Sequence, residues 1–322
     1  MGYCGMARFA IASILILTAQ AAQIRGGAGP AAVDGQERFV VNENFLMLAA
    51  RRFAHAFART RNDSPNSAVD AAAAATVRVV NGEESALGRY PFLASQGDEE
   101  NDWFFCGASL IRDDWVLTAG HCLYNNPDWQ LAVRLQFGRY DLELSNDEEG
   151  GIMRRVVEFV KYPEYNAWKY DVALLKLSSP IPASVATPIA LDAGGEARAG
   201  RDVILAGWGS TDEACSVYDA VQREANLTIA SFDECSGINN EMSRWYPRNN
   251  GTTLCAGRYV GDDDAGAAAS GAEWAEAGCG DSGGPLVVYN AATGVPTQVG
   301  IVSWGYGHTH TVYARVSAFK VQ

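Results

Sequence analysis

Clusters of lysine and arginine are missing from this sequence. Of its 322 residues, 25 are Lys or Arg and 38 are Asp or Glu, which gives a net charge of −13. Binding to nucleic-acid phosphates requires clustered basic side chains, so the composition argues against a nucleic-acid-binding protein. We interpret the acidity as an aid to solubility rather than the mark of a partner.

Apolar runs long enough to cross a bilayer are also missing near the N-terminus. The run at residues 9–19 is too short to span a membrane, follows Arg8, and is followed by Ala-Gln-Ala at residues 19–21. This pattern predicts a signal peptide over residues 1–21 and a secreted, extracellular protein without membrane contact once the signal is removed. The alternative, a buried helix, is disfavoured because nothing amphipathic follows.

Residues 22–78 have little β patterning. They are rich in Gly and Ala and carry several arginines, ending in Thr-Val-Arg at residues 76–78. Because this stretch directly follows the predicted signal, we interpret it as a removable pro-segment. A disordered linker without a role is the alternative.

After Arg78 the sequence lacks a long helical period. Short apolar runs alternate with turn residues, which predicts an antiparallel β sandwich or a pair of barrels. No internal repeat is evident. The runs lie at residues 115–119, 131–137, 172–177, 202–206, 285–288 and 299–304.

One serine has the surroundings of a nucleophile. Ser282 lies in Gly-Asp-Ser-Gly-Gly-Pro-Leu at residues 280–286, where glycines on both sides allow unusual dihedral angles and close approach of a ligand. A serine hydroxyl is a poor nucleophile at neutral pH, so this reading requires a histidine base and a carboxylate that orients it.

Histidine is scarce, with four in the chain, which narrows the search for the base. His121 ends the apolar run that starts at Trp115 and precedes a cysteine that could tether it. Asp171 opens the run at residues 172–177. A carboxylate leading into a buried strand is costly unless it has a partner, and an imidazole N–H is such a partner.

These three segments, TAGHC, DVALLKL and GDSGGPL, occur in the order found in the trypsin/chymotrypsin family of serine endopeptidases. The sequence resembles that family from about residue 79 to its end. The resemblance implies an all-β fold of two antiparallel Greek-key barrels with the catalytic cleft between them. It places the first barrel at about residues 79–195 and the second at about 196–322.

The resemblance assigns roles to the candidate residues. Ser282 attacks the scissile carbonyl to form an acyl-enzyme, His121 accepts and returns the proton, and Asp171 fixes the imidazole tautomer. The backbone N–H groups of Gly280 and Ser282 form the oxyanion hole. We therefore expect a secreted serine endopeptidase that acts on proteins or peptides without a cofactor.

Arg-Val-Val-Asn-Gly at residues 78–82 is similar to the family's activation site. Cleavage after Arg78 by an activating protease would free the α-amino group of Val79. In the family this ammonium pairs with the aspartate before the nucleophile, here Asp281, and orders the amide of Gly280. The resemblance therefore implies a zymogen.

Cysteine usage fits the family only in part. Of seven cysteines, Cys4 leaves with the signal, so six remain for three bridges. The resemblance implies two of these bridges. They are Cys106–Cys122 and Cys235–Cys255.

The third pair departs from the family. Its usual cysteine stands two residues before the first glycine of GDSGG, whereas here Cys279 directly precedes Gly280, and the usual partner's position holds His308. We hypothesise a Cys215–Cys279 disulfide instead.

Specificity for the residue before the scissile bond rests on two positions. Trypsin-like relatives carry an aspartate six residues before the nucleophile. That count reaches Glu276, or Ala277 if a deletion precedes Gly280.

The wall of that pocket is formed in the family by Ser303, Trp304 and Gly305, which also pair with the substrate backbone. Thr311 stands where trypsin-like members have glycine and elastase-like members have threonine. We expect a shallow pocket for small or medium apolar side chains, with Arg or Lys held by Glu276 as the alternative.

The sequence signals for glycosylation and for metal binding are weaker than those for catalysis. Asn226 and Asn250 begin glycosylation sequons. Residues 141–149 match in position a calcium-binding loop of some relatives, but Arg139 occupies the place of an acidic ligand. We expect no metal site.

Two other functions compete with the protease. A non-catalytic homologue that binds partners is one, and the intact Ser, His and Asp argue against it. A structural or carbohydrate-binding β protein is the other, and it would not need Ser282. No assembly segment is evident, so we expect a monomer.

Overall fold

The computed structural model describes eight stretches of the chain. The predicted signal peptide, pro-segment and activation site, together with Asn250 and His308, lie outside the described residues. The described stretches are residues 82–98, 103–123, 132–166, 169–212, 214–237, 251–260, 273–305 and 310–319.

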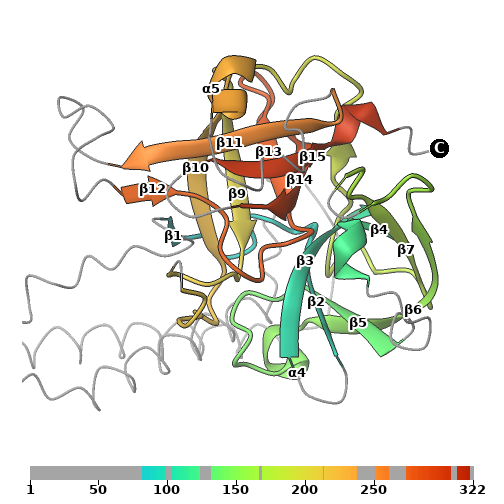
Figure 1. Cartoon of the computed structure of the whole chain (residues 1–322). Helices are drawn as coiled ribbons and strands as arrows, with labels where there is room; N and C mark the ends of the chain where they lie inside the picture. Colours follow the sequence, from blue (N-terminus) through green and yellow to red (C-terminus); the bar gives the residue numbers. More distant parts are fainter. Residues whose placement is uncertain are drawn as a thin grey trace, which may run out of the picture. The chain divides into compact units, whose positions relative to one another are not determined.

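Six antiparallel strands close the first barrel in the order β2-β3-β4-β7-β6-β5 (Figure 1). Pairing of β2 with β5 closes the ring. In β7, buried and partly buried residues alternate, as expected for a strand with one face on the core. The strands are β2 (Leu93–Asp98), β3 (Trp103–Arg112), β4 (Trp115–Thr118), β5 (Val133–Phe137), β6 (Ile152–Lys161) and β7 (Ala173–Leu177).

A second ring has the order β10-β9-β13-β14-β15-β11, and pairing of β10 with β11 closes it. A further strand, β12 (Glu273–Ala275), extends the edge of β11. The ring strands are β9 (Asp202–Gly207), β10 (Arg223–Ile229), β11 (Thr253–Val260), β13 (Pro285–Tyr289), β14 (Pro296–Trp304) and β15 (Thr311–Arg315).

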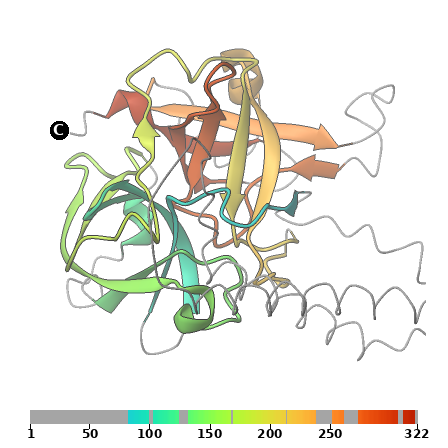
Figure 2. The ribbon, with the colours of Figure 1, turned by 180° about the vertical axis from the view of Figure 1, so that it is seen from behind.

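Two short strands outside the six-stranded ring also belong to the second sheet. β1 (Glu83–Glu84) is antiparallel to β10, beside which it lies in Figure 2. β8 (Ala190–Leu191) is parallel to β14. The chain therefore contacts the second barrel both before and after it builds the first.

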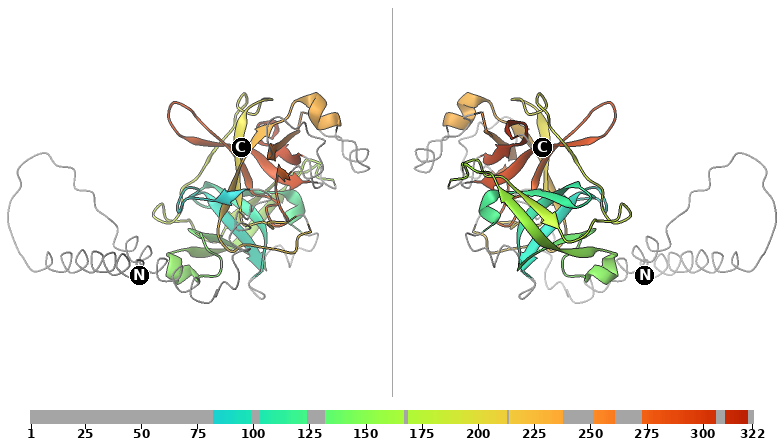
Figure 3. Two further views of the ribbon diagram at one scale, coloured as in Figure 1. Left: turned by 90° about the vertical axis from the view of Figure 1, so that its left-hand side faces the viewer. Right: turned by 90° about the vertical axis from the view of Figure 1, so that its right-hand side faces the viewer.

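Helices are few and short among the described residues, and none of them is long and apolar enough to cross a membrane. The α-helices α4 (Asn146–Glu149) and α5 (Phe232–Gly237) lie on different barrels (Figure 3). The side chain of Ser145 caps α4 and Glu148 completes a capping box. One-turn 3-10 helices are η3 (Gly120–Cys122) and η4 (Val316–Ala318).

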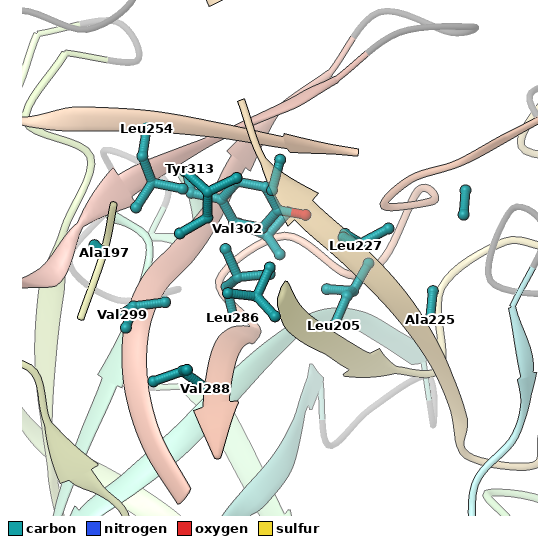
Figure 4. Close-up of a cluster of buried hydrophobic side chains, with 14 residues drawn as sticks. Ala197, Leu205, Ala225, Leu227, Leu254, Leu286, Val288, Val299, Val302 and Tyr313 are labelled. Carbon is teal, nitrogen blue, oxygen red and sulfur yellow. The ribbon is translucent and has the colours of Figure 1, made fainter. Parts of the chain in front are cut away.

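Each barrel is filled by its own apolar cluster. In the second barrel the ring of Tyr313 lies among Leu227, Leu254 and Val302 (Figure 4). A separate cluster that includes Leu135, fully buried, fills the first barrel. Two closed antiparallel barrels confirm the predicted fold class, and each of the six apolar runs overlaps a strand.

Candidate active site

The end of β4 fixes His121. Two residues after Thr118 the chain enters the single turn η3, which carries His121 and Cys122. A Cβ atom on Gly120 would lie 2.9 Å from the ring of Tyr165 and 3.3 Å from Oδ1 of Asp171. Only glycine allows so close an approach at this position.

Asp171 holds the imidazole at two points. Nδ1 of His121 lies 2.7 Å from Oδ2 of Asp171, and the backbone N–H of His121 donates to Oδ1 at 2.8 Å. Since a carboxylate only accepts hydrogen bonds, Nδ1 carries the proton, which leaves Nε2 as the basic nitrogen. The Asp171 side chain is 1% exposed and that of His121 is 13% exposed.

A third partner of Asp171 comes from the second barrel. Oγ of Ser303 donates to Oδ2 of Asp171 at 2.5 Å. The sequence identified Ser303 only through its backbone, and no motif indicated that its hydroxyl supports the carboxylate. This hydrogen bond joins the two barrels at the base of the site.

The loop that carries Ser282 packs against the two strands that lead to His121. The backbone N–H of Gly107, on β3, donates to the carbonyl of Ser282 at 2.8 Å, and the N–H of Gly283 donates to Val302 on β14 at 2.8 Å. Gly283 has a φ of 79°, and a Cβ there would collide with Oγ1 of Thr118. The loop is thus fixed between β14 and the strands β3 and β4.

Two backbone donors beside Ser282 remain available. Gly280 adopts a φ of 98°, a conformation that favours glycine. The N–H groups of Asp281, Gly283 and Gly284 donate to backbone carbonyls, whereas those of Gly280 and Ser282 donate to no group in the described stretches. A pair of unused, fixed N–H groups is what an oxyanion hole requires.

Asp281 points away from this pair into the second barrel. Its side chain is fully buried and accepts 2.9 Å hydrogen bonds from the N–H groups of Gly209 and Gly278. Burial raises its pKa to about 6, and the two N–H groups offset part of that rise. A Cβ on Gly207 or Gly209 would collide with this carboxylate. No cation pairs with Asp281 among the described residues.

Comparison with known proteins agrees with this geometry. Residues 79–321 match the family model "Trypsin". The chain belongs to the trypsin family. It is 31% identical to Trypsin-1 of Astacus astacus over 247 residues, which are 74% of this chain and 93% of that protein.

Two longer relatives match the same part of this trypsin-family chain. Serine proteinase stubble of Drosophila melanogaster is 31% identical over 256 residues, 75% of this chain and 30% of that protein. Transmembrane protease serine 9 of Rattus norvegicus is 32% identical over 256 residues, 76% of this chain and 21% of that protein. The chain spans less than a third of either of these relatives.

Two of the residues expected to line the trypsin-family specificity pocket, Ala277 and Gly305, lie beside Thr311. Its Oγ1 accepts a 3.0 Å hydrogen bond from the N–H of Ala277, and a Cβ on Gly305 would lie 3.6 Å from the same oxygen. Glu276, the neighbour of Ala277, is buried, with 3% exposed. Trp304 ends β14 directly before Gly305.

All six remaining cysteines are paired. Cys106–Cys122 joins β3 to η3 beneath His121, with a Cα–Cα distance of 6.3 Å. Cys235–Cys255 joins α5 to β11 at 5.8 Å. The hypothesised Cys215–Cys279 bridge is present, with a Cα–Cα distance of 5.6 Å.

Where some relatives bind calcium, this trypsin-family chain has a guanidinium. Nε of Arg139 donates to Oε2 of Glu149 at 2.8 Å, and both side chains are almost fully buried. The guanidinium also donates to Gln136 and to the carbonyl of Leu144. A positive group therefore occupies the centre of the loop.

A cluster of possible metal ligands lies beside the site. The side chains of Cys106, His121 and Cys122 approach one another within 4.8 Å. Because the two sulfurs are bonded to each other, they offer no thiolate to a metal. This cluster therefore does not fit a metal ion.

Proposed function

We propose that the chain is a secreted serine endopeptidase that cleaves proteins or peptides through Ser282, His121 and Asp171. In the proposed reaction Nε2 of His121 takes the proton of Ser282 as Oγ attacks the carbonyl carbon. The N–H groups of Gly280 and Ser282 stabilise the resulting oxyanion. His121 then protonates the leaving amine, and water releases the acyl group by the reverse steps.

One observation carries this proposal. The base and its carboxylate are hydrogen-bonded at 2.7 Å, and the loop of Ser282 is held by Gly107 against the strands that end in that base. A binding protein would need neither the imidazole tautomer that Asp171 enforces nor unused N–H groups beside a serine. Membership of the trypsin family supports the same conclusion.

Activation by cleavage after Arg78 is the second part of the proposal. Asp281 is buried with a raised pKa and two N–H partners but no described cation. The ammonium of Val79 would supply the missing positive charge. Its arrival would favour the ionised carboxylate and thereby hold the backbone on either side of Ser282.

For specificity, Thr311 supports a shallow pocket. Its side chain is buried, contacts Ala277 through a hydrogen bond and stands across from Gly305. We infer a preference for small or medium apolar residues before the scissile bond. Arg or Lys bound by Glu276 is the alternative outcome of the experiment below.

The decisive experiment is hydrolysis of a peptide library by protein cleaved after Arg78, with Ser282→Ala and uncleaved Arg78→Gln protein as controls. We expect cleavage and fluorophosphonate labelling by the processed wild type, none by Ser282→Ala, and strongly reduced rates for Arg78→Gln. The residues before each cut distinguish the two pocket assignments. Correctly folded, processed protein that cleaves nothing would favour the non-catalytic homologue.

Secretion and glycosylation complete the proposal. Asn226 is exposed on β10 within the sequon Asn-Leu-Thr, so a glycan there would not disturb the core. We expect the protein in the medium of expressing eukaryotic cells, beginning after residue 21. Mass spectrometry before and after glycosidase treatment, with Asn226→Gln as control, tests both points. Retention inside the cell with an intact N-terminus would contradict secretion.

A further inference from the structure

We propose that the Cys215–Cys279 disulfide is a positioning element of the oxyanion hole, whose cleavage lowers kcat. Cys279 lies directly before Gly280 in the chain, and Gly280 supplies one of the two N–H groups assigned to the oxyanion. This inference rests on the proposed function and extends it to two residues outside the proposed triad and oxyanion hole.

The argument begins with one peptide unit, the one between Cys279 and Gly280. Its carbonyl accepts a 2.7 Å hydrogen bond from the N–H of Ser210. Because a trans peptide is planar, its C=O and N–H point in opposite directions. Anchoring the carbonyl to Ser210 therefore directs the Gly280 N–H away from Ser210.

This peptide unit needs an external restraint. Glycine pays little for a change of φ, so the peptide could rotate and place the carbonyl of Cys279 where the N–H of Gly280 belongs. The N–H of Cys279 donates to Oγ of Ser210 at 2.9 Å, and its sulfur is bonded to Cys215. Backbone and side chain of Cys279 are thus both tied to residues 210–215.

The loop that holds Cys215 is itself braced. Oδ1 of Asp212 accepts 2.8 Å hydrogen bonds from the N–H groups of Ser216 and Val217, and the N–H of Thr211 donates to Val217 at 2.8 Å. Cys215 has a φ of 55°, which is unfavourable for a residue with a side chain. Once the disulfide is broken, Cys215 is free to relax and the restraint on Cys279 weakens.

The Cys215–Cys279 disulfide is more exposed to solvent than the other two disulfides. Cys279 is exposed and Cys215 is partly exposed, whereas the other four bonded cysteines are at most 4% exposed. A water-soluble dithiol therefore reaches Cys215–Cys279 first. In that exchange the S–S bond accepts two electrons and two protons to become two thiols, and the dithiol is oxidised to its own disulfide.

The first test compares paired serine variants after processing at Arg78. We expect Cys215→Ser/Cys279→Ser to lower kcat between about 10- and 100-fold with KM changed less than threefold, because losing an oxyanion-hole donor costs about 10²–10³ in kcat. The matched control is Cys235→Ser/Cys255→Ser, which removes the other second-barrel disulfide and should keep the kcat of its folded fraction. A site variant with wild-type kcat would overturn the proposal.

The second test uses the wild-type protein, so it does not depend on the folding of a variant. A mild dithiol should release two thiols, mapped by mass spectrometry to Cys215 and Cys279, and slow fluorophosphonate labelling of Ser282 by at least tenfold. Reoxidation should restore the rate, with the circular dichroism spectrum unchanged throughout. Two released thiols with an unchanged labelling rate would refute the proposal. If untreated processed protein never labels, the proposed function itself fails.

Discussion

At the scale of single residues, the site depends on side chains that hold other side chains in position. Asp171 is shared between His121 and Ser303, one from each barrel. Asp281, by contrast, accepts hydrogen bonds from two backbone N–H groups, and no cation pairs with it among the described residues. The same residue type therefore supports an imidazole in one case and in the other lies buried without a cation among the described residues.

Ser303→Ala should lower kcat roughly tenfold, because a hydrogen bond to a charged group contributes about 1.5–3 kcal/mol. KM should change little, since the proposed contact with substrate uses the backbone of Ser303, which the variant keeps. Steady-state kinetics on a peptide amide measures both values. A variant with raised KM and unchanged kcat would contradict support of Asp171.

Asp281 makes the stability of the uncleaved chain depend on pH. Its pKa is raised from 3.8 to about 6 in the folded protein. Between these values the unfolded state loses its proton while the folded state keeps it, so the free energy of unfolding falls as pH rises, by roughly 3 kcal/mol in total. This destabilisation is absent below the lower pKa and complete above the higher one.

Asp281→Asn should abolish this pH dependence of the unfolding free energy. The uncleaved Ser282→Ala protein cannot digest itself. We expect its urea unfolding to show a fall in unfolding free energy between about pH 4 and pH 6. The double variant Asp281→Asn/Ser282→Ala should lack it. Parallel pH curves for the two proteins would contradict the burial of an unpaired Asp281.

At the scale of elements, the loop between β5 and β6 is organised around a buried ion pair. Glu149, the last residue of α4, accepts from the guanidinium of Arg139 and from the N–H groups of Tyr140 and Asp141. A four-residue helix has little stability of its own. The ion pair and the Ser145 cap therefore hold the loop in place of a bound metal.

Glu149→Gln should cost about 3–5 kcal/mol of unfolding free energy, because it leaves the charge of Arg139 buried without its partner. The matched control is Asp114→Asn, which breaks the partly exposed pair with Lys176 and should cost much less than Glu149→Gln, because solvent screens an exposed ion pair. Urea denaturation measures both. Equal losses in the two variants would show that burial does not decide the cost.

The sequence was sufficient for elements and residues that carry a local pattern. The six apolar runs, the flanking glycines of Ser282 and the place of Asp171 at the start of an apolar run are local features, and the sequence was sufficient to predict them. Contacts without a local sequence signal could not be predicted in this way. The hydroxyl of Ser303 on Asp171 joins residues 132 positions apart, and the two-residue strands β1 and β8 are too short to show a period.

At the scale of the whole molecule, the backbones of the two barrels approach each other closely near the nucleophile. A Cβ on Gly107 would lie 2.9 Å from the Cα of Gly284 and 3.1 Å from its nitrogen. Backbone atoms cannot move aside as a flexible side chain does. The spacing of the barrels, and with it the position of Ser282 relative to His121, depends on the absence of one methyl group.

Gly107→Ala should therefore reduce kcat/KM at least 100-fold, since small displacements of reacting groups carry penalties of about 10². Gly88→Ala is the control: nothing lies within 4 Å of its Cβ, although its φ of 75° makes alanine strained. That control should lose about 1 kcal/mol of stability and keep its kinetics. Wild-type activity in Gly107→Ala protein would contradict the close approach of the barrels.

The strand β1 has a consequence for the new N-terminus that the proposed cleavage creates. Glu83 is paired with Glu224 on the second barrel, and three residues lie between it and position 79, which makes four Cα–Cα steps. A chain of that length reaches at most about 14 Å. The freed ammonium would thus be a ligand tethered by a short chain segment. Its effective concentration would be in the millimolar range or above. Its capture is independent of how dilute the protein is, and each residue inserted between positions 79 and 83 would weaken it.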